Sequence, residues 1–280
     1  MNGVILVNKE KGKTSRDVVN DVSHILHTKK VGHTGTLDPI ATGVLVITVG
    51  RYTKLTEVLT STYKEYIAEF KLGVLTDTLD ITGVVLKNEK VHIKDADIRS
   101  AVLSFKKSYM QEVPIYSSVK INGKKLYEYA RKGEEVNLPS RNVDIKEIEV
   151  LSINNGIIKI KTLVSKGTYI RSLIRDIGGS LGVPATMTSL VRTKQGKFSI
   201  EDTFNVDDIK NNNYKMLTIE DVMDVEVIDA SEEVYFKISN GVKMLSIYNK
   251  EFVLFKYNGK EISLYRKDGD IYRNYLSIDV

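Results

Sequence analysis

The sequence has no cysteine, no tryptophan and only four prolines in 280 residues. Without cysteine, disulfide bonds and thiolate metal sites are excluded. Long apolar runs are also missing. The longest, residues 44–49, is interrupted by Thr48 and is far short of the roughly 20 residues that cross a bilayer, and residues 4–7 are too few for a signal peptide. We therefore expect a cytoplasmic protein with no membrane segment.

The chain as a whole has little net charge, because 41 Lys and Arg against 36 Asp and Glu leave only +5. The surplus is uneven. Residues 119–197 hold 15 basic and 7 acidic side chains, whereas residues 198–280 hold 10 and 16. The fold can thus present a basic face that neutralises phosphates, although charges spread over every surface fit such counts equally well.

Hydrophobic periodicity and turn residues predict a mixed α and β chain. Val18, Val19 and Val22 fall on one face of a helix that Ser15 is expected to cap. Alternating apolar residues predict a strand around Tyr66. Further strands are expected at 3–9 and 44–49, helices at 53–62, 94–106, 126–133 and 168–181, and hairpins at Asn122-Gly123 and Asn154-Asn155-Gly156.

The C-terminal part has a different composition. Residues 205–228 are polar and acidic, and we interpret them as a linker. Residues 231–280 hold nine of the 22 aromatic residues in short alternating segments. Turns are expected at Asn240-Gly241, Asn258-Gly259 and Asp268-Gly269, so this region is predicted to be a small all-β barrel.

Two common motifs can be set aside. Gly12-Lys13-Thr14 resembles the end of a phosphate-binding loop, but that motif needs a glycine where Val7 stands. His24, His27 and His33 could be zinc ligands by spacing, yet no acidic ligand is suitably placed. We expect no metal site and a surface or groove role for His24 and His27.

Two segments combine reactive side chains with turn-forming residues. Asp38 stands in GHTGTLDPIATG, where the backbone turns can aim its carboxylate at a ligand, although an Asp-Pro pair is also an ordinary turn former. In SKGTYIRSLIRD, Tyr169 and Arg171 lie where a strand meets a helix, so they could face a base and a carboxylate, respectively. An ordinary helix start with exposed cations is the alternative.

Together these segments resemble the tRNA pseudouridine(55) synthases of the TruB family. The resemblance continues in VNKEKGKTS, RYTKLTEVL, KEYIAEFKLGVLTDTLD, PIYSSVKINGKKLYEYARKGEEV and LVRTKQGKF, in the family's order, across most of residues 3–200. Two positions depart from the family pattern. Glu10 stands where a proline is usual, and Val191 replaces the first of two arginines.

The resemblance implies an α+β pseudouridine-synthase fold with a mixed, largely antiparallel sheet flanked by helices and loops. A catalytic domain at residues 1–228 would be followed by a small, β-barrel-like PUA-type RNA-binding domain at 229–280. The implied reaction converts uridine 55 in the T loop of tRNA to pseudouridine, by flipping the nucleotide out of the RNA and without a cofactor.

The resemblance also assigns roles to residues. Asp38 matches the catalytic aspartate, Arg171 its ion-pair partner, and Tyr66 the tyrosine that stacks on the target base. His33 matches the residue that fills the vacated stack, and Tyr169 and Leu190 match residues that line the uracil pocket. Charge alone adds candidate phosphate contacts: Lys54, Lys120, Lys124, Lys125, Arg131 and Lys132.

The expected partner is therefore the T arm of tRNA, and we expect a monomer that needs no protein partner. Two other functions remain open from the residues. One is an RNA-binding protein that keeps the fold without catalysis. The other is a hydrolytic glycosidase that uses two carboxylates and releases free uracil.

Overall fold

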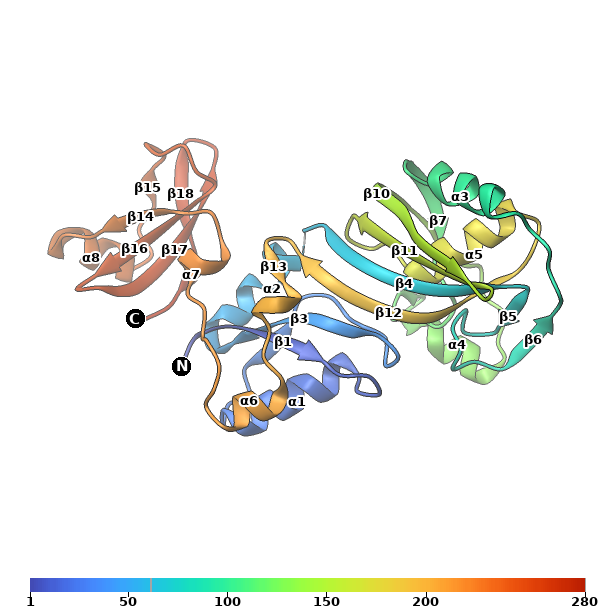
Figure 1. Cartoon of the computed structure of the whole chain (residues 1–280). Coiled ribbons are helices and arrows are strands. Elements are labelled where there is room, and N and C mark those ends of the chain that lie inside the picture. Colours follow the sequence, from blue (N-terminus) through green and yellow to red (C-terminus); the bar gives the residue numbers. More distant parts are fainter. Residues whose placement is uncertain (61, 280) are drawn as a thin grey trace. The chain divides into compact units, whose positions relative to one another are not determined.

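The computed structural model describes residues 1–60 and 62–279, in two compact units (Figure 1). Unit 1 comprises Met1–Asp38, Leu45–Ser61 and Glu201–Val280. Unit 2 comprises Pro39–Val44 and Thr62–Ile200. The chain passes between them inside β3 (Thr42–Val49).

Unit 1 begins with an apolar layer of strands covered by a helix. Strand β1 (Gly3–Lys9) lies beside β3, and β2 (Val31–His33) pairs antiparallel with it. Helix α1 (Ser15–Ile25) buries Val18, Val19 and Val22 against these strands, as its spacing predicts.

Helix α1 is capped by Thr14 rather than by Ser15, so the predicted cap is wrong by one residue. The Thr14 side chain accepts a hydrogen bond from the Asp17 backbone N–H, and the Asp17 carboxylate accepts one from the Thr14 backbone N–H. This reciprocal capping box satisfies two backbone donors. It leaves the hydroxyl of Ser15 available for another contact.

The stretch predicted to be a linker is packed into unit 1. It forms α6 (Val206–Lys210) and α7 (Ile219–Val222), and Ile209 and Ile219 are fully buried. Leu217 also exchanges backbone hydrogen bonds with Val4 on β1. The linker interpretation is wrong because a few apolar side chains anchor an otherwise polar stretch to the core.

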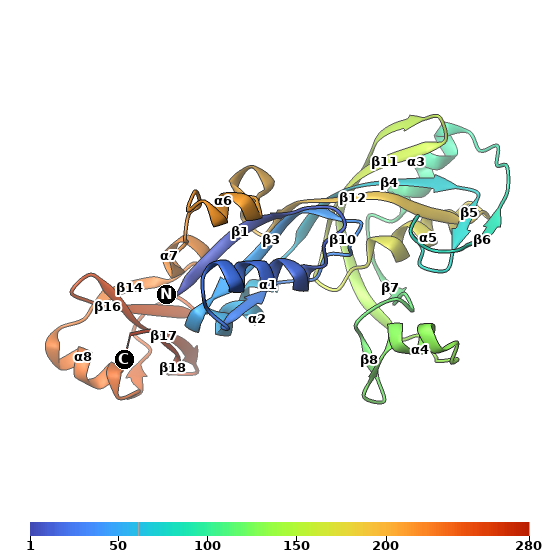
Figure 2. The same cartoon turned by 90° about the horizontal axis from the view of Figure 1, so that it is seen from below.

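The end of unit 1 is a five-stranded sheet in the order β14-β16-β17-β18-β15 (Figures 1 and 2). The strands are β14 (Glu226–Asp229), β15 (Met244–Leu245), β16 (Phe252–Tyr257), β17 (Lys260–Asp268) and β18 (Ile271–Ser277). Asn258-Gly259 and Asp268-Gly269 join strands as predicted. The region is not all-β, because Ser231 caps helix α8 (Glu232–Ser239), which Asn240-Gly241 ends.

This C-terminal sheet is fastened to the first half of unit 1. In the 3-10 helix η1 (Gly50–Leu55), the Tyr52 hydroxyl donates to the carboxylate of Glu261 on β17, which also accepts from the Ile219 backbone N–H. Burial, first, and then the Glu261 carboxylate raise the pKa of Tyr52 far above its ordinary value. Tyr52 is 1% exposed, so this bond is made away from water.

Unit 2 is built on a curved sheet in which the first residues of β3 are followed by β12-β4-β11-β10-β7. The pairing of β12 with β3 is parallel and the other pairs are antiparallel, which confirms a mixed, largely antiparallel sheet. The strands are β4 (Lys64–Leu72), β7 (Ser108–Glu112), β10 (Ser140–Asn154), β11 (Ile157–Val164) and β12 (Ala185–Gln195).

Helices and small sheets complete unit 2. Helix α5 (Ile170–Ser180) packs on β4 and β12, and α3 (Asp95–Ser104) packs on β10. The predicted hairpin at Asn122-Gly123 joins β8 (Lys120–Ile121) to β9 (Lys124–Lys125) and runs into α4 (Leu126–Lys132). Figure 2 shows this basic segment projecting from the sheet of unit 2.

Of the remaining short elements, only the helix at 53–62 was predicted from the sequence. Of the helix expected at 53–62, residues 56–60 form α2 (Thr56–Thr60), residues 53–55 belong to η1, and Ser61 lies outside the described residues. The others are β5 (Val74–Thr76), β6 (Val85–Asn88), β13 (Phe198–Ser199) and η2 (Ile200–Asp202). Within residues 1–60 and 62–279 the longest helices have 11 residues, too few to span a bilayer.

Candidate active site

The loop that carries Asp38 is anchored in unit 1 by the residues that precede Asp38. Before it, β2 pairs with β3, and the backbone N–H of buried Thr34 donates to the carbonyl of Val46 at 3.0 Å. Next to Asp38, the Leu37 N–H donates to the Ser15 Oγ at 2.8 Å, and the Ser15 hydroxyl donates to the Leu37 carbonyl. Ser15 and Leu37 are both buried, so the hydroxyl at the start of α1 fixes the backbone beside the half-buried Asp38.

After the loop, the chain enters unit 2 through a close backbone contact. Gly43 has φ +102°, and a Cβ there would lie 2.2 Å from the carbonyl oxygen of Arg192. The Arg192 side chain is fully buried, and its Nε–H donates to the Val44 carbonyl at 2.7 Å. Only glycine fits where β3 meets β12. The one arginine left from the family's pair is therefore a core residue and not a surface phosphate contact.

Tyr66 and Leu190 share one face of the sheet of unit 2. Leu190 on β12 is opposite Ala68 on β4, two residues from Tyr66 on that face. Tyr66 itself is flanked by Arg192 on β12 and Thr162 on β11. Tyr66 is 7% and Leu190 6% exposed, so both residues are buried on the face of the sheet that also carries Arg192.

Lys64 adds a second cation at this end of β4. Its side chain is 6% exposed and donates to the Thr62 carbonyl at 3.0 Å. Burial, and then the charges of Arg192 and Lys166, lower the pKa of Lys64 to about 8. The sequence marks this position only as a polar start of a strand, so its electrostatics could not be predicted.

Arg171 is held by carbonyl groups from two loops of unit 2. It is 5% exposed in the first turn of α5. Its Nη1 donates to the Thr78 carbonyl at 2.9 Å and its Nη2 to the Tyr116 carbonyl at 3.0 Å. The predicted helix start with exposed cations is thus wrong for Arg171, whose guanidinium is fixed inside the fold.

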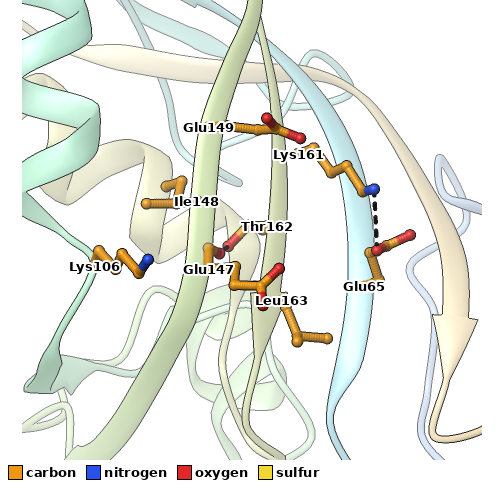
Figure 3. Close-up of a pocket in the computed structure, with 8 residues that line it drawn as sticks. All are labelled: Glu65, Lys106, Glu147, Ile148, Glu149, Lys161, Thr162 and Leu163. Carbon is orange, nitrogen blue, oxygen red and sulfur yellow. Dashed lines mark hydrogen bonds and ion pairs between the residues drawn. The ribbon is translucent and has the colours of Figure 1, made fainter.

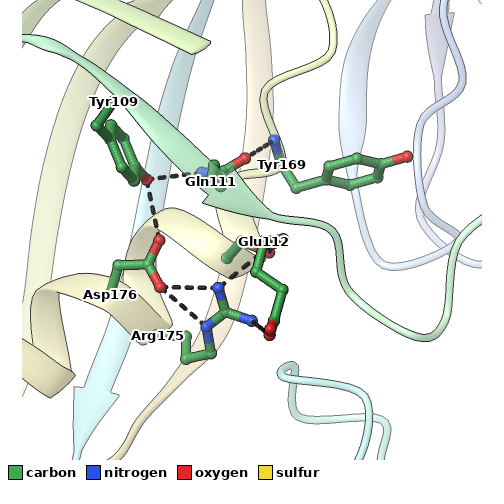
Figure 4. A network of polar contacts seen from close by, with 7 residues as sticks. Tyr109, Gln111, Glu112, Tyr169, Arg175 and Asp176 are labelled. Carbon is green, nitrogen blue, oxygen red and sulfur yellow. Dashed lines mark hydrogen bonds and ion pairs between the residues drawn. The ribbon is translucent and has the colours of Figure 1, made fainter. Parts of the chain in front are cut away.

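Tyr169 caps the same helix and is positioned by a buried glutamine (Figure 4). Its backbone N–H donates to the Gln111 Oε1 at 2.8 Å, and the Gln111 Nε2 donates to the Tyr109 hydroxyl at 2.8 Å. Tyr109 in turn donates to Asp176, which pairs with Arg175. Figure 4 shows the Tyr169 ring pointing away from this network. Its backbone is fixed while its ring lies outside this network.

The same network perturbs Tyr109. Burial, followed by the nearby Asp176 carboxylate, raises the pKa of Tyr109 well above its ordinary value. The phenol therefore stays protonated and keeps donating to Asp176. Gln111 is fully buried, and its amide orientation is set because its oxygen must face the Tyr169 N–H.

The projecting segment of unit 2 combines cations with tyrosines. Lys124 lies 4.2 Å from the ring centroid of Tyr129, and Lys125 and Arg131 lie 5.4 and 5.3 Å from that of Tyr127. Lys124 also pairs with Glu134, so its charge is partly offset. Lys120, Arg131 and Lys132 are exposed, as phosphate contacts require.

The remaining candidates lie in unit 1. Asp38 and His33 belong to it, and the half-buried His33 ends β2. Lys54 lies 5.3 Å from the ring centroid of Tyr275. The rings of His24 and His27 are 6.5 Å apart, but no group of His, Asp and Glu that could hold a metal occurs in the described part of the chain.

A hollow of about 240 Å³ in unit 2 is a separate feature (Figure 3). Glu65 lines it and pairs with Lys161 at 3.2 Å. Because side chains alternate along a strand, Glu65 points to the opposite face of β4 from Tyr66. We therefore do not include this hollow in the candidate active site.

Sequence reasoning missed the supporting residues. Ser15, Gln111 and the carbonyls of Thr78 and Tyr116 act across distances of 22 to 93 positions along the chain. Ser15 alone gives a signal in the sequence, because it stands at the start of a helix, but that position predicts a cap and not a contact with Leu37.

Several known proteins and two family models are similar to this chain in sequence. The family model of the N-terminal domain of TruB family pseudouridylate synthases matches residues 23–170, and that of the tRNA pseudouridylate synthase B C-terminal domain matches residues 171–236. A curated relative from Clostridium tetani, tRNA pseudouridine synthase B, is 46% identical over 87% of this chain and 86% of its own length. The protein of the same name from Lactobacillus acidophilus is 38% identical over 99% of this chain and 98% of its own.

Solved structures agree at the level of the fold. A chain of an H/ACA RNP bound to a substrate RNA containing 2′-deoxyuridine has a TM-score of 0.70 at 22% identity, covering 99% of this chain and 85% of that one. A chain of a Cbf5-Nop10-Gar1 complex gives 0.70 at 23% identity, covering 98% and 85%. The expected α+β pseudouridine-synthase fold with a large mixed sheet is therefore confirmed, and the C-terminal region predicted to be β-barrel-like is a curled five-stranded sheet.

Proposed function

The chain belongs to the TruB family of pseudouridylate synthases, and we propose that it isomerises uridine to pseudouridine in tRNA, at position 55 of the T loop. The observation that carries the proposal is the anchored Asp38 loop within a chain whose relatives are named tRNA pseudouridine synthase B. The reaction breaks the N1–C1′ bond and forms a C5–C1′ bond. N1 gains a proton and C5 loses one, so no oxidant, reductant or water is consumed.

We assign the central step to Asp38. A carboxylate can attack an electron-poor carbon or stabilise positive charge on a sugar. Such work needs a defined position, which the two hydrogen bonds between Ser15 and Leu37 support. The carboxylate has three possible points of action, which are C1′, the uracil ring and the proton on C2′.

Arg171 is assigned the role of keeping Asp38 ionised. A guanidinium stays protonated at all relevant pH values, and its charge favours the anionic form of a carboxylate. The carbonyls of Thr78 and Tyr116 hold the Arg171 side chain in place without neutralising its charge. This support favours a fixed electrostatic role over that of a mobile surface cation.

Tyr66, Tyr169 and Leu190 are proposed to receive the flipped uridine. The apolar side chains of Tyr66 and Leu190, on one face of the sheet, suit an uncharged base, and a phenol can both stack on uracil and handle the C5 proton. His33 is proposed to fill the space that the nucleotide leaves in the RNA. Extrusion costs a few kcal/mol, which contacts in the pocket must offset.

RNA binding is assigned to two regions. We propose that the basic segment 120–132 and Lys54 contact phosphates, because exposed cations beside aromatic rings suit an RNA backbone. Residues 1–228 are proposed to carry catalysis, and residues 229–280, as a PUA-like domain, to add contacts to tRNA.

The test is release of tritium from T-arm RNA labelled at C5 of uridine. Asp38→Asn should abolish release while RNA binding stays within about twofold, because the amide keeps the shape but loses the charge. The matched control is Asp21→Asn, which removes a carboxylate of α1 that makes only a surface ion pair with Lys13.

Unimpaired release by the Asp38→Asn variant would remove Asp38 from the mechanism. Chromatography of the wild-type products separates the other two functions. Free uracil would indicate a glycosidase, and binding without any product would indicate an RNA-binding protein.

A further inference from the structure

Arg141 lies against the face of Tyr169 in unit 2. Arg141 is the second residue of β10, and its guanidinium carbon is 5.5 Å from the centroid of the Tyr169 ring. The backbone of Tyr169 is itself fixed by Gln111. A guanidinium in this position makes a cation–π contact with the ring. Such a contact becomes stronger when the cation and the ring are partly removed from water.

Gly167 leaves room for this arginine. Its φ is +82°, and a Cβ on it would lie 3.1 Å from the Arg141 Nη1. The glycine of the SKGTY segment thus serves two needs, a left-handed turn and the close approach of a cation. Arg141 is therefore part of a built arrangement, and not a surface side chain that lies on a ring by chance.

The nearby carboxylates are engaged elsewhere. Asp144 accepts hydrogen bonds from Tyr63 and Ser108, whereas Glu112 and Asp176 pair with Arg175. Within the part of the chain that the structure describes, the side chain of Arg141 has neither an ion pair nor a hydrogen bond, and only its backbone pairs with Gln111 on β7. A half-buried guanidinium that lacks an anion is ready to accept one from a ligand.

The geometry points to a phosphate of the RNA strand, next to the target uridine, as the ligand of Arg141. The contact with the Tyr169 ring uses none of the guanidinium N–H groups as donors to a protein oxygen, and their planar fork matches two phosphate oxygens. A phosphate bound there would lie beside Tyr169, which the proposed function places against the uracil. This inference rests on the proposed function and adds to it a residue that grips the flanking backbone.

The first experiment measures affinity for a T-arm stem-loop as a function of salt. Arg141→Gln should weaken binding about tenfold and reduce the slope of log K against log salt by about 0.7 to 0.9, the amount for one phosphate contact. Arg141→Lys keeps the charge and should keep the slope. The control is Arg99→Gln, an exposed arginine on α3 that should change neither.

The second experiment locates the phosphate. Neutral methylphosphonates are placed one at a time around the target uridine. One position should weaken binding by the wild-type protein about tenfold but should have no further effect on Arg141→Gln. If Arg141→Gln does not fold, as judged by circular dichroism, the same RNAs are measured with Arg141→Lys. That variant should lose less affinity than the wild type when the methylphosphonate is at that position.

The results separate the inference from the function. Wild-type affinity and slope in Arg141→Gln, or equal methylphosphonate losses in wild type and variant, would overturn the phosphate contact while pseudouridine formation stands. A lower rate with an unchanged salt slope would mean that Arg141 only packs against Tyr169, and that also overturns it. Absence of pseudouridine with the wild-type protein would instead overturn the proposed function.

Discussion

Ser15 is the residue on which the position of Asp38 depends most directly. Ser15→Ala removes both hydrogen bonds to Leu37 and leaves a buried backbone N–H without a partner, which costs about 1 to 3 kcal/mol. We expect the rate of a single turnover to fall about tenfold or more, because small displacements of a reacting group are costly. RNA affinity should change little. Rapid-quench assays and filter binding measure the two quantities.

The control for Ser15 is Ser104→Ala, since the Ser104 hydroxyl bonds only to the Ala101 carbonyl of its own helix. That variant should match the wild type. If Ser15→Ala also turned over at the wild-type rate, the loop would hold Asp38 without the serine.

Lys64 should make stability depend on pH. Its pKa of about 8 in the folded protein lies below its ordinary value of 10.5, so between these values the unfolded chain binds a proton that the folded one lacks. The free energy of unfolding therefore rises with pH across this window, and below pH 8 the full cost of the buried charge remains. The rise is up to about 3 kcal/mol.

Lys64→Met should remove this rise, as measured by urea unfolding at pH 7.5 and pH 10. The variant should gain stability over the wild type at pH 7.5, and the gain should shrink at pH 10. Lys87→Met, at an exposed surface lysine, should leave the pH dependence unchanged. The assigned pKa would be contradicted by a constant difference between wild type and Lys64→Met at the two pH values.

At the level of single residues, the sequence could identify groups with characteristic chemistry but not their supports. Asp38, Tyr169 and Arg171 stand in recognisable segments. Their neighbours Gln111 and Ser15 are common polar residues whose importance comes only from contacts that the fold creates.

Among the elements, the junction of β3 and β12 leaves no room for a side chain at Gly43. Gly43→Ala places a Cβ against the Arg192 carbonyl at a φ that alanine rarely adopts, and we expect a loss of about 3 kcal/mol or more. Gly123→Ala also has a positive φ but meets no atom within 4 Å, so it should cost only about 1 kcal/mol. Thermal unfolding of both variants separates the clash from the backbone strain. Equal losses would show that the close approach to Arg192 is unimportant.

Elements with local signals could be predicted from the sequence. Helix α4 ends at Gly133, and both Asn-Gly hairpins predicted in unit 2 form, because capping and turn chemistry act within a few residues. Helices α6, α7 and α8 were missed. All three have eight or fewer residues, and their apolar positions gain meaning only from the cores they contact.

For the whole molecule, the uneven charge predicts salt-dependent binding. Neutralising both Arg131 and Lys132 with glutamine should reduce the slope of log K against log salt by about 1.5, because each phosphate contact releases a counterion. Lys210→Gln with Lys215→Gln, in the acidic C-terminal part, is the matched control and should leave the slope unchanged. If the slope of log K against log salt were the same for the wild type and both double variants, Arg131 and Lys132 would not contact RNA phosphates.

The composition of the whole chain could not reveal this preference. A net charge of +5 is unremarkable in a protein of this length, and only the position of the basic segment on a projecting hairpin and helix gives it meaning. The acidic C-terminal sheet is fastened to η1 through Tyr52 and Glu261. This contact stabilises unit 1 independently of any contact that the sheet makes with RNA.

The most direct test of the central claim is mapping of pseudouridine at single-nucleotide resolution in tRNA from cells with and without this protein. Our account predicts that position 55 of the T loop is pseudouridine in the first and uridine in the second. Restoring the wild-type chain should restore the modification, and restoring the Asp38→Asn variant should not. Unchanged pseudouridine at position 55 in cells that lack the protein would contradict the account.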